Sequence, residues 1–180
     1  MYHERKLSTN ETIHVFDEVF EAFDAFNFEL YVRDSYYVRI PISKSSLSKN
    51  ETFFGSILSE ADVEKHGLFK TSGFEKIKNF FTDKKIQRSW ILVGEFGTKS
   101  LYHADYDRRG VTLLYYVNTF WHPEWGGETL FCNGFGEPEI AIACKPNRVV
   151  IFPSNILHKP SGITRDAITR YSLTTTFVNE

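Results

Sequence analysis

Apolar positions in the C-terminal half of the chain recur in short runs that glycine, proline and asparagine separate. These runs are rich in Val, Ile, Thr, Tyr and Phe, which is typical of β-strands bounded by turns. The pattern predicts strands near residues 87–96, 99–105, 111–118, 128–132, 139–144, 147–152, 157–162 and 169–178. Short strands at this spacing favour a β-sandwich or barrel.

The N-terminal half shows helical spacing instead. Residues 8–26 are predicted to form a helix, because Ser8 and Glu11 fit a capping box and Phe16, Phe20 and Phe23 follow at roughly helical spacing. The other elements predicted here are strand material at 29–40, a surface loop at 43–50 and short helices at about 59–67 and 73–82. We expect a mainly β protein with flanking helices.

The amino-acid composition is typical of a globular protein. The 180 residues are 42% hydrophobic and 16% aromatic, enough to bury a core and too apolar for a disordered chain. We expect a single domain over residues 1–180, in which residues 1–85 form a supporting region for a core at 86–180. Cys132 and Cys144 do not make a disulfide framework, and buried free thiols are favoured over a disulfide or a metal role.

The net charge and the hydropathy pattern limit the kinds of binding partner and the cellular location that we expect for this protein. A formal net charge of −2 gives no basic excess, so neither nucleic acid nor an anionic membrane is indicated as a partner. The chain shows no apolar stretch of membrane-spanning length and no N-terminal signal pattern. These observations predict a soluble cytoplasmic protein.

The strongest chemical signal is His103-Ala104-Asp105, followed much later by His158. Alternate side chains on a strand share a face, so His103 and Asp105 can point at one ion. His158, at the end of an apolar run, can complete a set of two histidines and one carboxylate, which leaves positions open on a non-haem Fe(II) ion. A His-x-Asp sequence is common by chance, so it indicates a metal site only when the residues around it support one. The remaining histidines, His3, His14, His66 and His122, are expected to be ordinary surface or hydrogen-bonded residues.

Arg170 lies in an otherwise apolar or hydroxylated predicted strand. A guanidinium there needs a partner, because an unpaired buried charge is costly. That partner is either a structural Asp or Glu, or the carboxylate of a ligand that the planar guanidinium binds with two hydrogen bonds.

Taken together, these motifs resemble the 2-oxoglutarate- and Fe(II)-dependent dioxygenases, and within them the prolyl 4-hydroxylase-like branch. The resemblance covers about residues 86–178. Its further carriers are the run from Val111 to Asn118, Trp121, the run from Gly126 to Phe131, the run from Pro146 to Pro153, and the run from Arg170 to Leu173. It implies a double-stranded β-helix, or jelly roll, with supporting helices on one side.

The resemblance also implies roles for individual residues. His103, Asp105 and His158 would be the iron ligands. Arg170 would bind the distal carboxylate of 2-oxoglutarate, with Tyr116 and Ser172 as additional partners. Arg109 matches a residue on the substrate side, although a solvated loop arginine is an equally good interpretation. The segments 43–50 and 106–110 are expected to frame the substrate entrance, because loops on a rigid β-scaffold commonly carry recognition.

The implied reaction is hydroxylation, with Fe(II) as the metal, 2-oxoglutarate and O₂ as co-substrates and ascorbate as an optional further cofactor. The leading substrate is a prolyl residue in a peptide or protein. One departure weakens this choice: many prolyl hydroxylases carry a Trp near the end of the Arg-containing strand, where this chain has Thr174-Thr175-Thr176-Phe177. Trp90, Phe96 and Tyr102 are the alternative aromatic residues.

Two other functions stay open. The first is an oxygenase of the same class that acts on a free amino acid or another small metabolite. The second is a non-catalytic jelly-roll binding module with a structural metal site. A structural site would be closed by a further ligand, whereas a catalytic site stays open. Three ligands and a separate arginine favour catalysis.

Overall fold

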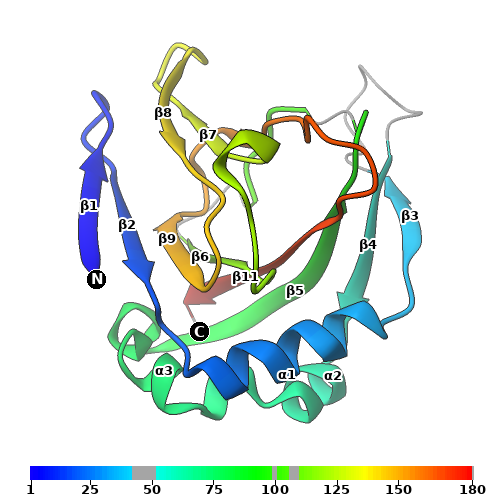
Figure 1. The fold of residues 1–180 in the computed structure, drawn as a ribbon. Helices are drawn as coiled ribbons and strands as arrows, with labels where there is room; N and C mark the ends of the chain where they lie inside the picture. The colour runs from blue at the N-terminus through cyan, green and yellow to red at the C-terminus, as the bar shows by residue number, and fades with distance from the viewer. Residues whose placement is uncertain (42–51, 99–100, 106–109, 180) are drawn as a thin grey trace.

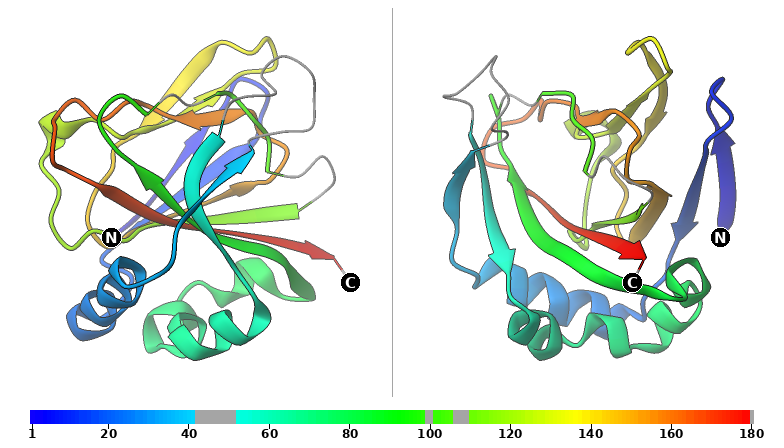
Figure 2. Two further views of the ribbon diagram at one scale, coloured as in Figure 1. Left: turned by 90° about the vertical axis from the view of Figure 1, so that its right-hand side faces the viewer. Right: turned by 180° about the vertical axis from the view of Figure 1, so that it is seen from behind.

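Two β-sheets face each other in the computed structural model, which describes residues 1–41, 52–98, 101–105 and 110–179. The larger sheet has the strand order β1-β2-β9-β6-β11-β5-β4-β3, and the smaller sheet has the order β10-β7-β8. Figure 1 shows helices α1 to α3 covering one face of the large sheet, with the small sheet on its other side. The same layering is visible in both views of Figure 2.

The strands of the large sheet are β1 (Tyr2–Lys6), β2 (Thr12–Asp17), β3 (Val38–Pro41), β4 (Thr52–Leu58), β5 (Lys84–Gly94), β6 (Gly110–Tyr116), β9 (Arg148–Pro153) and β11 (Arg170–Asn179). The strands of the small sheet are β7 (Thr129–Cys132), β8 (Pro138–Ile142) and β10 (His158–Pro160). The helices are α1 (Ala22–Arg33), α2 (Glu60–His66) and α3 (Ser72–Glu75), with 3-10 turns η1 (Leu68–Lys70), η2 (Lys78–Phe81) and η3 (Pro123–Trp125). All strand pairs are antiparallel.

Alternation along the central strands gives the large sheet two buried faces. Leu113, Tyr115 and Leu173 point to the outer face, where they pack against Phe28 and Val32 of α1 in one apolar cluster. Successive strand residues point to opposite faces, so the residues between them point inward. Central strands buried on both faces explain the nearly continuous apolar run in β6 and β9.

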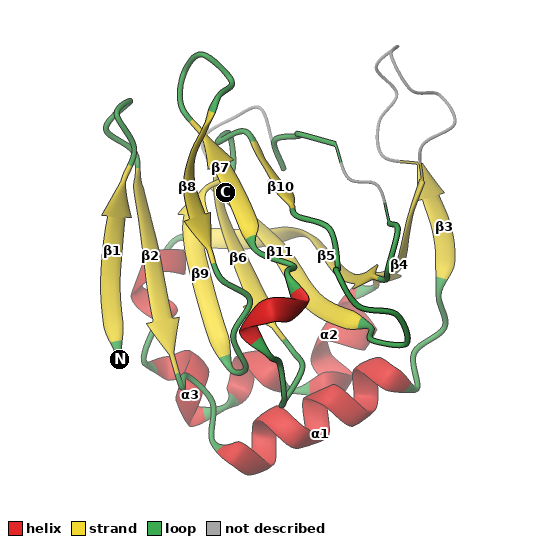
Figure 3. Ribbon diagram, turned by 45° about the horizontal axis from the view of Figure 1, so that its top comes forward, coloured by secondary structure: helices red, strands yellow, loops and turns green. Residues whose placement is uncertain are grey.

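The inward-facing residues form a second core between the two sheets. Leu114, Val150 and Phe152 of the large sheet meet Phe131 and Ile142 of the small sheet in this cluster. The ring centroids of Phe131 and Phe152 are 4.9 Å apart in an edge-to-face arrangement. Figure 3 shows β7, β8 and β10 lying over β9, β6 and β11, so this interior is enclosed on two sides.

The predicted helix at residues 8–26 is wrong except at its end, where residues 22–26 belong to α1. Residues 2–17 instead form the hairpin of β1 and β2, in which Ile13, Val15 and Asp17 are buried and alternate with less buried residues. The amide and the hydroxyl of Ser8 donate to the carboxylate of Glu139, each over 2.8 Å, so Ser8 caps no helix. A period of two therefore explains this stretch, and the spaced phenylalanines misled the prediction.

Two further N-terminal predictions need correction. Residues 29–33 belong to α1, and only Val38–Pro41 of the predicted strand material is a strand. Apolar packing of Phe28 and Val32 on the sheet overrides the strand propensity of this stretch. The helix predicted at 73–82 is only the short α3 followed by the η2 turn.

Most of the C-terminal prediction is confirmed. The strands predicted from 87–96 and from 111–178 correspond to β5 to β11. The helix predicted at about 59–67 is α2, which begins at a capping box of Ser59 and Asp62. The strand predicted at 99–105 is wrong within the described residues, where His103 forms only an isolated bridge to His158. Cys132 and Cys144 are buried free thiols. The loop predicted at 43–50 lies outside the described residues.

Candidate active site

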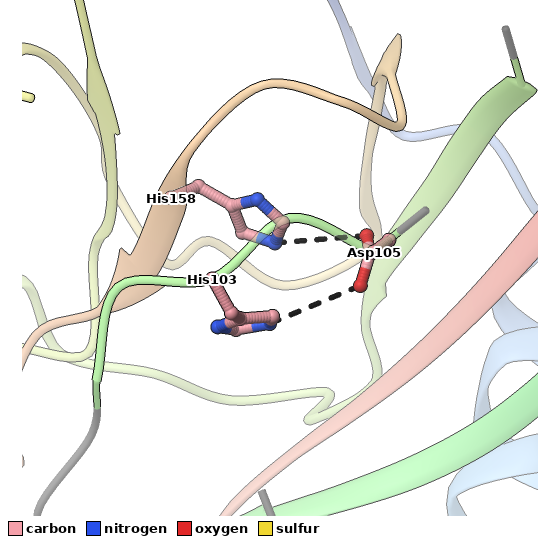
Figure 4. Close-up of side chains that lie close together, drawn as sticks. All are labelled: His103, Asp105 and His158. Atoms are coloured by element: carbon pink, nitrogen blue, oxygen red, sulfur yellow. Dashed lines mark ion pairs between the residues drawn. The ribbon is translucent and has the colours of Figure 1, made fainter. Parts of the chain in front are cut away.

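The three predicted metal ligands converge between the small sheet and the segment that follows β5 of the large sheet. His103 lies in the segment that follows β5, Asp105 comes two residues later, and His158 is the first residue of β10. Figure 4 shows both imidazoles turned toward the Asp105 carboxylate, one to each oxygen. The Nε2 atom of His103 is 3.8 Å from Oδ1 of Asp105, and that of His158 is 3.6 Å from Oδ2. One ligand atom from each residue lies within 4.8 Å of the others.

Backbone pairing sets the histidines beside each other. The amide of His103 donates to the carbonyl of His158 over 2.9 Å, and the reverse bond has the same length. This single antiparallel bridge places the two ring centroids 4.6 Å apart. The three side chains therefore lie together, although a bridge between distant segments brings them together and not a continuous strand. Their binding of an ion stays a prediction.

Each imidazole is held through its other nitrogen. Nδ1 of His103 is 3.1 Å from the carbonyl of Leu101, and Nδ1 of His158 is 2.9 Å from the carbonyl of Ile156. A carbonyl only accepts, so Nδ1 carries the proton and the Nε2 lone pair points into the cluster. Burial is the main cause that lowers the pKa of His158, and His103 nearby adds to it. A neutral imidazole is the form that binds a metal.

The carboxylate of Asp105 is held by donors from β5 and β6, the two strands on either side of β11 in the large sheet. Thr112 of β6 donates its hydroxyl proton to Oδ2 over 2.9 Å. Arg88 of β5 donates through Nη2 to Oδ1 over 3.2 Å and also to the backbone carbonyl of Asp105. Asp105 is 7% exposed, so these bonds are made largely out of water. The sequence analysis gave Arg88 and Thr112 no role. The strand alternation that turns both side chains to the inner face is the feature of the sequence that could have identified them.

The second part of the site is Arg170, the first residue of β11, which pairs with Gly94 of β5. Arg170 is 5% exposed, and its Nε has no hydrogen-bond partner among the described residues. Its guanidinium carbon lies 5.1 Å from the ring centre of Tyr116, and it forms no ion pair with any carboxylate in the described part of the chain. The structural alternative, a protein carboxylate paired with Arg170, is therefore not observed there.

Gly127 makes room for this arginine. It adopts a φ of +79°, which side chains rarely tolerate, and an added Cβ would lie 3.0 Å from Cδ of Arg170. Its neighbour Gly126 has a φ of +71° and accepts a hydrogen bond from the indole of Trp121 over 3.0 Å. The two glycines lie between η3 and β7, where positive φ angles and close neighbours disfavour a side chain.

Tyr116 and Ser172 are register partners on β6 and β11 and share the inner face with Arg170. The Tyr116 hydroxyl is 2.8 Å from the Thr129 hydroxyl and 3.2 Å from the carbonyl of Ile142. Burial is the main cause that raises the pKa of Tyr116 to about 12, so the phenol stays protonated. The hydroxyl of Ser172 is buried and has no partner in the described residues.

A polar row on the inner face of β11 connects the two parts of the site. Alternate residues Arg170, Ser172, Thr174 and Thr176 share this face, and Thr176 pairs with Thr112, the donor to Asp105. Arg170, Ser172 and Thr176 each keep a buried polar atom without a partner among the described residues. Such atoms are costly unless a ligand or water satisfies them. A ligand or water that satisfies these atoms would lie along the inner face of β11.

Other sequence predictions fall elsewhere. Arg109 and most of the segment 106–110 lie outside the described residues, so the substrate-entrance prediction for them stays a prediction. His3, His14, His66 and His122 take no part in the three-residue cluster. Trp90 is on the inner face of β5, opposite Thr174, whereas Phe96 is 62% exposed.

Comparison with known proteins identifies the family of the chain. Residues 89–178, half of the chain, match the model of the 2OG-Fe(II) oxygenase superfamily, so the chain belongs to this family. Members use Fe(II) and 2-oxoglutarate, and the chain is a 2-oxoglutarate-dependent dioxygenase. No protein of curated function matches the chain in sequence.

Solved structures with the same fold include enzymes with different kinds of substrate. A prolyl-4-hydroxylase of Pseudomonas putida has a TM-score of 0.67 at 16% identity, over 92% of this chain and 91% of that one. A Trichoplax adhaerens prolyl hydroxylase, solved with a hypoxia inducible factor peptide, has a TM-score of 0.67 at 15% identity, over 93% and 83%. The epimerase SnoN, solved with Fe³⁺, α-ketoglutarate and nogalamycin RO, has a TM-score of 0.68 at 12% identity, over 93% and 78%.

These similarities confirm the mainly β jelly-roll fold with flanking helices. At such low identity they carry the fold alone, so they do not identify the substrate. None of the helices in the described residues has the length and apolar character that a membrane span requires.

Proposed function

We propose that His103, Asp105 and His158 bind Fe(II), that Arg170 binds 2-oxoglutarate, and that the protein hydroxylates a prolyl residue in a peptide or protein. The observation that carries the proposal is the pairing of an open three-ligand cluster with a buried arginine that has no carboxylate partner in the described residues. When bound, Fe(II) and 2-oxoglutarate activate O₂ for transfer of one oxygen atom to a substrate C–H bond, with succinate and CO₂ as the other products.

The donor set fits the metal. Two imidazole nitrogens and one carboxylate oxygen suit non-haem Fe(II) and leave coordination positions open for co-substrates. No fourth Cys, His, Asp or Glu joins the cluster within the described residues, as a closed structural site would require. The carbonyls of Leu101 and Ile156 fix the imidazole tautomers, and this orients both Nε2 atoms before the metal arrives.

The inner face of β11 fits the co-substrate. The Arg170 guanidinium would form a charge-assisted pair with the distal carboxylate, and the orphaned hydroxyl of Ser172 would donate to the same group. Tyr116 lies under the guanidinium and stays a neutral donor at physiological pH. To reach the carboxylate, its hydroxyl would exchange the bond that it now makes to the carbonyl of Ile142.

The prolyl substrate is supported by two observations. Prolyl hydroxylases are among the structures with the same fold. Trp90 offers an aromatic surface on the inner face of β5, next to Thr174, where the family's tryptophan is missing from β11. Because the Arg88 guanidinium covers one face of the Trp90 ring, a proline ring would pack against the other face.

A small metabolite is the second candidate. SnoN was solved with the small molecule nogalamycin RO bound, and it shares the fold. The missing tryptophan on β11 favours this candidate, because the threonines that replace it leave a smaller and more polar wall.

Anaerobic addition of Fe(II) and 2-oxoglutarate tests the site, and turnover of a proline-containing peptide library, read by mass spectrometry, tests the substrate. We expect a weak visible charge-transfer band that needs both components, and a gain of one oxygen atom on proline. Asp105→Ala should abolish both signals, whereas His122→Ala, a half-exposed histidine in a turn, should retain them. A band without any prolyl product would favour the small metabolite; no band with the wild type would overturn the site.

A further inference from the structure

Arg88 reaches the cluster from the inner face of β5, where it pairs with Thr176 of β11. One nitrogen of its guanidinium, Nη2, serves two atoms of Asp105. It donates to the backbone carbonyl and, over 3.2 Å, to Oδ1 of the carboxylate. A single cation therefore fixes the main chain and the side chain of the same residue.

Asp105 needs such support because no regular strand carries it. The preceding strand β5 ends at Gly94, and the described residues between it and Asp105 pair with other segments only through two isolated bridges, Phe96 to Ile163 and His103 to His158. A loop residue has more conformational freedom than a strand residue. Thr112 restrains only the other carboxylate oxygen, Oδ2. Arg88 is the one described side chain that bonds both the carbonyl and the carboxylate.

Arg88 is itself held in place. Its guanidinium carbon lies 4.4 Å from the ring centre of Trp90, two residues along the same strand face. A planar guanidinium stacks on an aromatic face, which limits its rotation. The side chain of Arg88 is 30% exposed and that of Asp105 only 5%, so the pair lies at the boundary between solvent and the site.

We propose that Arg88 is a positioning residue that holds Asp105 in the orientation that binds the metal, with Trp90 as its support. This inference rests on the proposed function of Asp105 as a ligand. Two effects of Arg88 oppose each other. As a fixed donor it orients the carboxylate and strengthens metal binding, whereas as a nearby cation it repels the metal. Removal of Arg88 should therefore lower the metal affinity if its main role is to orient Asp105, and raise the metal affinity if its main effect is charge repulsion.

Calorimetric titration of the metal-free protein with Mn(II), without 2-oxoglutarate, provides the test. For Arg88→Met we expect Mn(II) affinity to fall about 10- to 100-fold, the usual cost of losing a partner of a metal ligand. Lys85→Met is the matched control: it removes a cation from an exposed position of the same strand and should bind Mn(II) like the wild type. The melting temperature of metal-free Arg88→Met should be close to that of metal-free Lys85→Met.

Arg88→Lys decides the case if Arg88→Met does not fold. Lysine keeps the charge but loses the planar fork and its stacking, so Mn(II) affinity should fall below that of the wild type. Trp90→Phe keeps an aromatic face and should bind Mn(II) more tightly than Trp90→Leu. Equal or tighter Mn(II) binding in the Arg88 variants would overturn the inference, as would a lower melting temperature of the metal-free protein with unchanged affinity. Wild-type protein that fails to bind Mn(II) would instead overturn the proposed metal site.

Discussion

At the scale of single residues, the most specific sign of a ligand is the set of buried polar atoms on β11 that find no partner in the described part of the chain. A buried donor or acceptor without a partner costs about 1–3 kcal/mol. Arg170 and Ser172 each carry such an atom, and they lie two residues apart on one strand face. A strand that keeps both atoms unpaired is less stable than one with two apolar residues. A carboxylate ligand on this face would recover that cost.

Arg170→Ala should raise the KM for 2-oxoglutarate tenfold or more while Fe(II) still binds. Hydrogen bonds to charged groups contribute about 1.5–3 kcal/mol, and about 1.4 kcal/mol is a factor of ten in affinity. Succinate formation at varied 2-oxoglutarate concentrations measures the effect. Arg165→Ala, which removes an exposed arginine near Trp125, is the control and should leave KM unchanged.

Ser172→Ala separates ligand binding from structure at the same face. Because the Ser172 hydroxyl has no partner in the described residues, its removal should not lower the melting temperature of the protein without 2-oxoglutarate. The KM for 2-oxoglutarate should still rise, by less than for Arg170→Ala. A loss of stability without any change in KM would show that Ser172 serves only the fold.

At the scale of elements, β-strands of the C-terminal half were predictable and the N-terminal hairpin was not. In β6 and β9 both faces are buried, so short apolar runs bounded by turn residues mark the strands. Phe16 lies in β2 and Phe20 in the connection between β2 and α1, yet their spacing imitates a helix. One face of β2 packs inward and the other carries the mixed residues His14 and Phe16, which concealed the period of two.

The site was predictable to a different degree for each residue. The spacing of His103, Asp105 and His158 identified the cluster, because metal ligands must be residues of a few types. Arg88 and Thr112 were not predicted, because Arg and Thr occur on many strands. Only the register of β5, β6 and β11 brings these two residues to Asp105. Residues that act through a ligand become visible only once pairing between distant segments is known.

The junction of α1 and α2 should make stability depend on pH. His66 ends α2 and packs on Phe28, with ring centroids 5.0 Å apart, while its Nδ1 accepts from the amide of Leu68 over 3.1 Å. Burial is the main cause that lowers the pKa of His66 to about 4. The unfolded chain, with a histidine pKa of about 6.5, then binds the proton first as pH falls. Stability contributed by neutral His66 is therefore complete above about pH 6.5 and lost toward pH 4.

Denaturant unfolding of the metal-free protein at several pH values measures this effect. We expect a loss on the order of 2–3 kcal/mol between pH 6.5 and 4, since one pKa unit is about 1.4 kcal/mol and the ring is partly exposed. His66→Asn keeps an acceptor for the Leu68 amide but cannot be protonated, so its profile should be flatter over this range. His122→Asn, in a turn, should retain the wild-type slope. Equal slopes for both variants would assign the pH dependence to other groups.

At the scale of the whole molecule, the cluster joins the small sheet to the large one. His158 begins β10 in the small sheet, while His103 and Asp105 belong to the segment after β5 of the large sheet. Asp105 is tied in turn to β5 and β6 through Arg88 and Thr112. A metal held by all three ligands would therefore cross-link the two sheets.

Metal binding should consequently raise the melting temperature of the entire chain in one transition. A ligand present at 100 times its Kd stabilises the folded state by about 2.7 kcal/mol, and for a protein of this size each kcal/mol raises Tm by about 2–4 °C. Mn(II) added at that excess to metal-free protein should thus raise Tm by roughly 5–11 °C, and a chelator should reverse the change. His158→Ala removes the ligand from the small sheet and should lose the shift, whereas His14→Ala, on β2, should keep it. A full shift in His158→Ala would mean that Mn(II) binds elsewhere and that the cluster does not join the sheets through a metal.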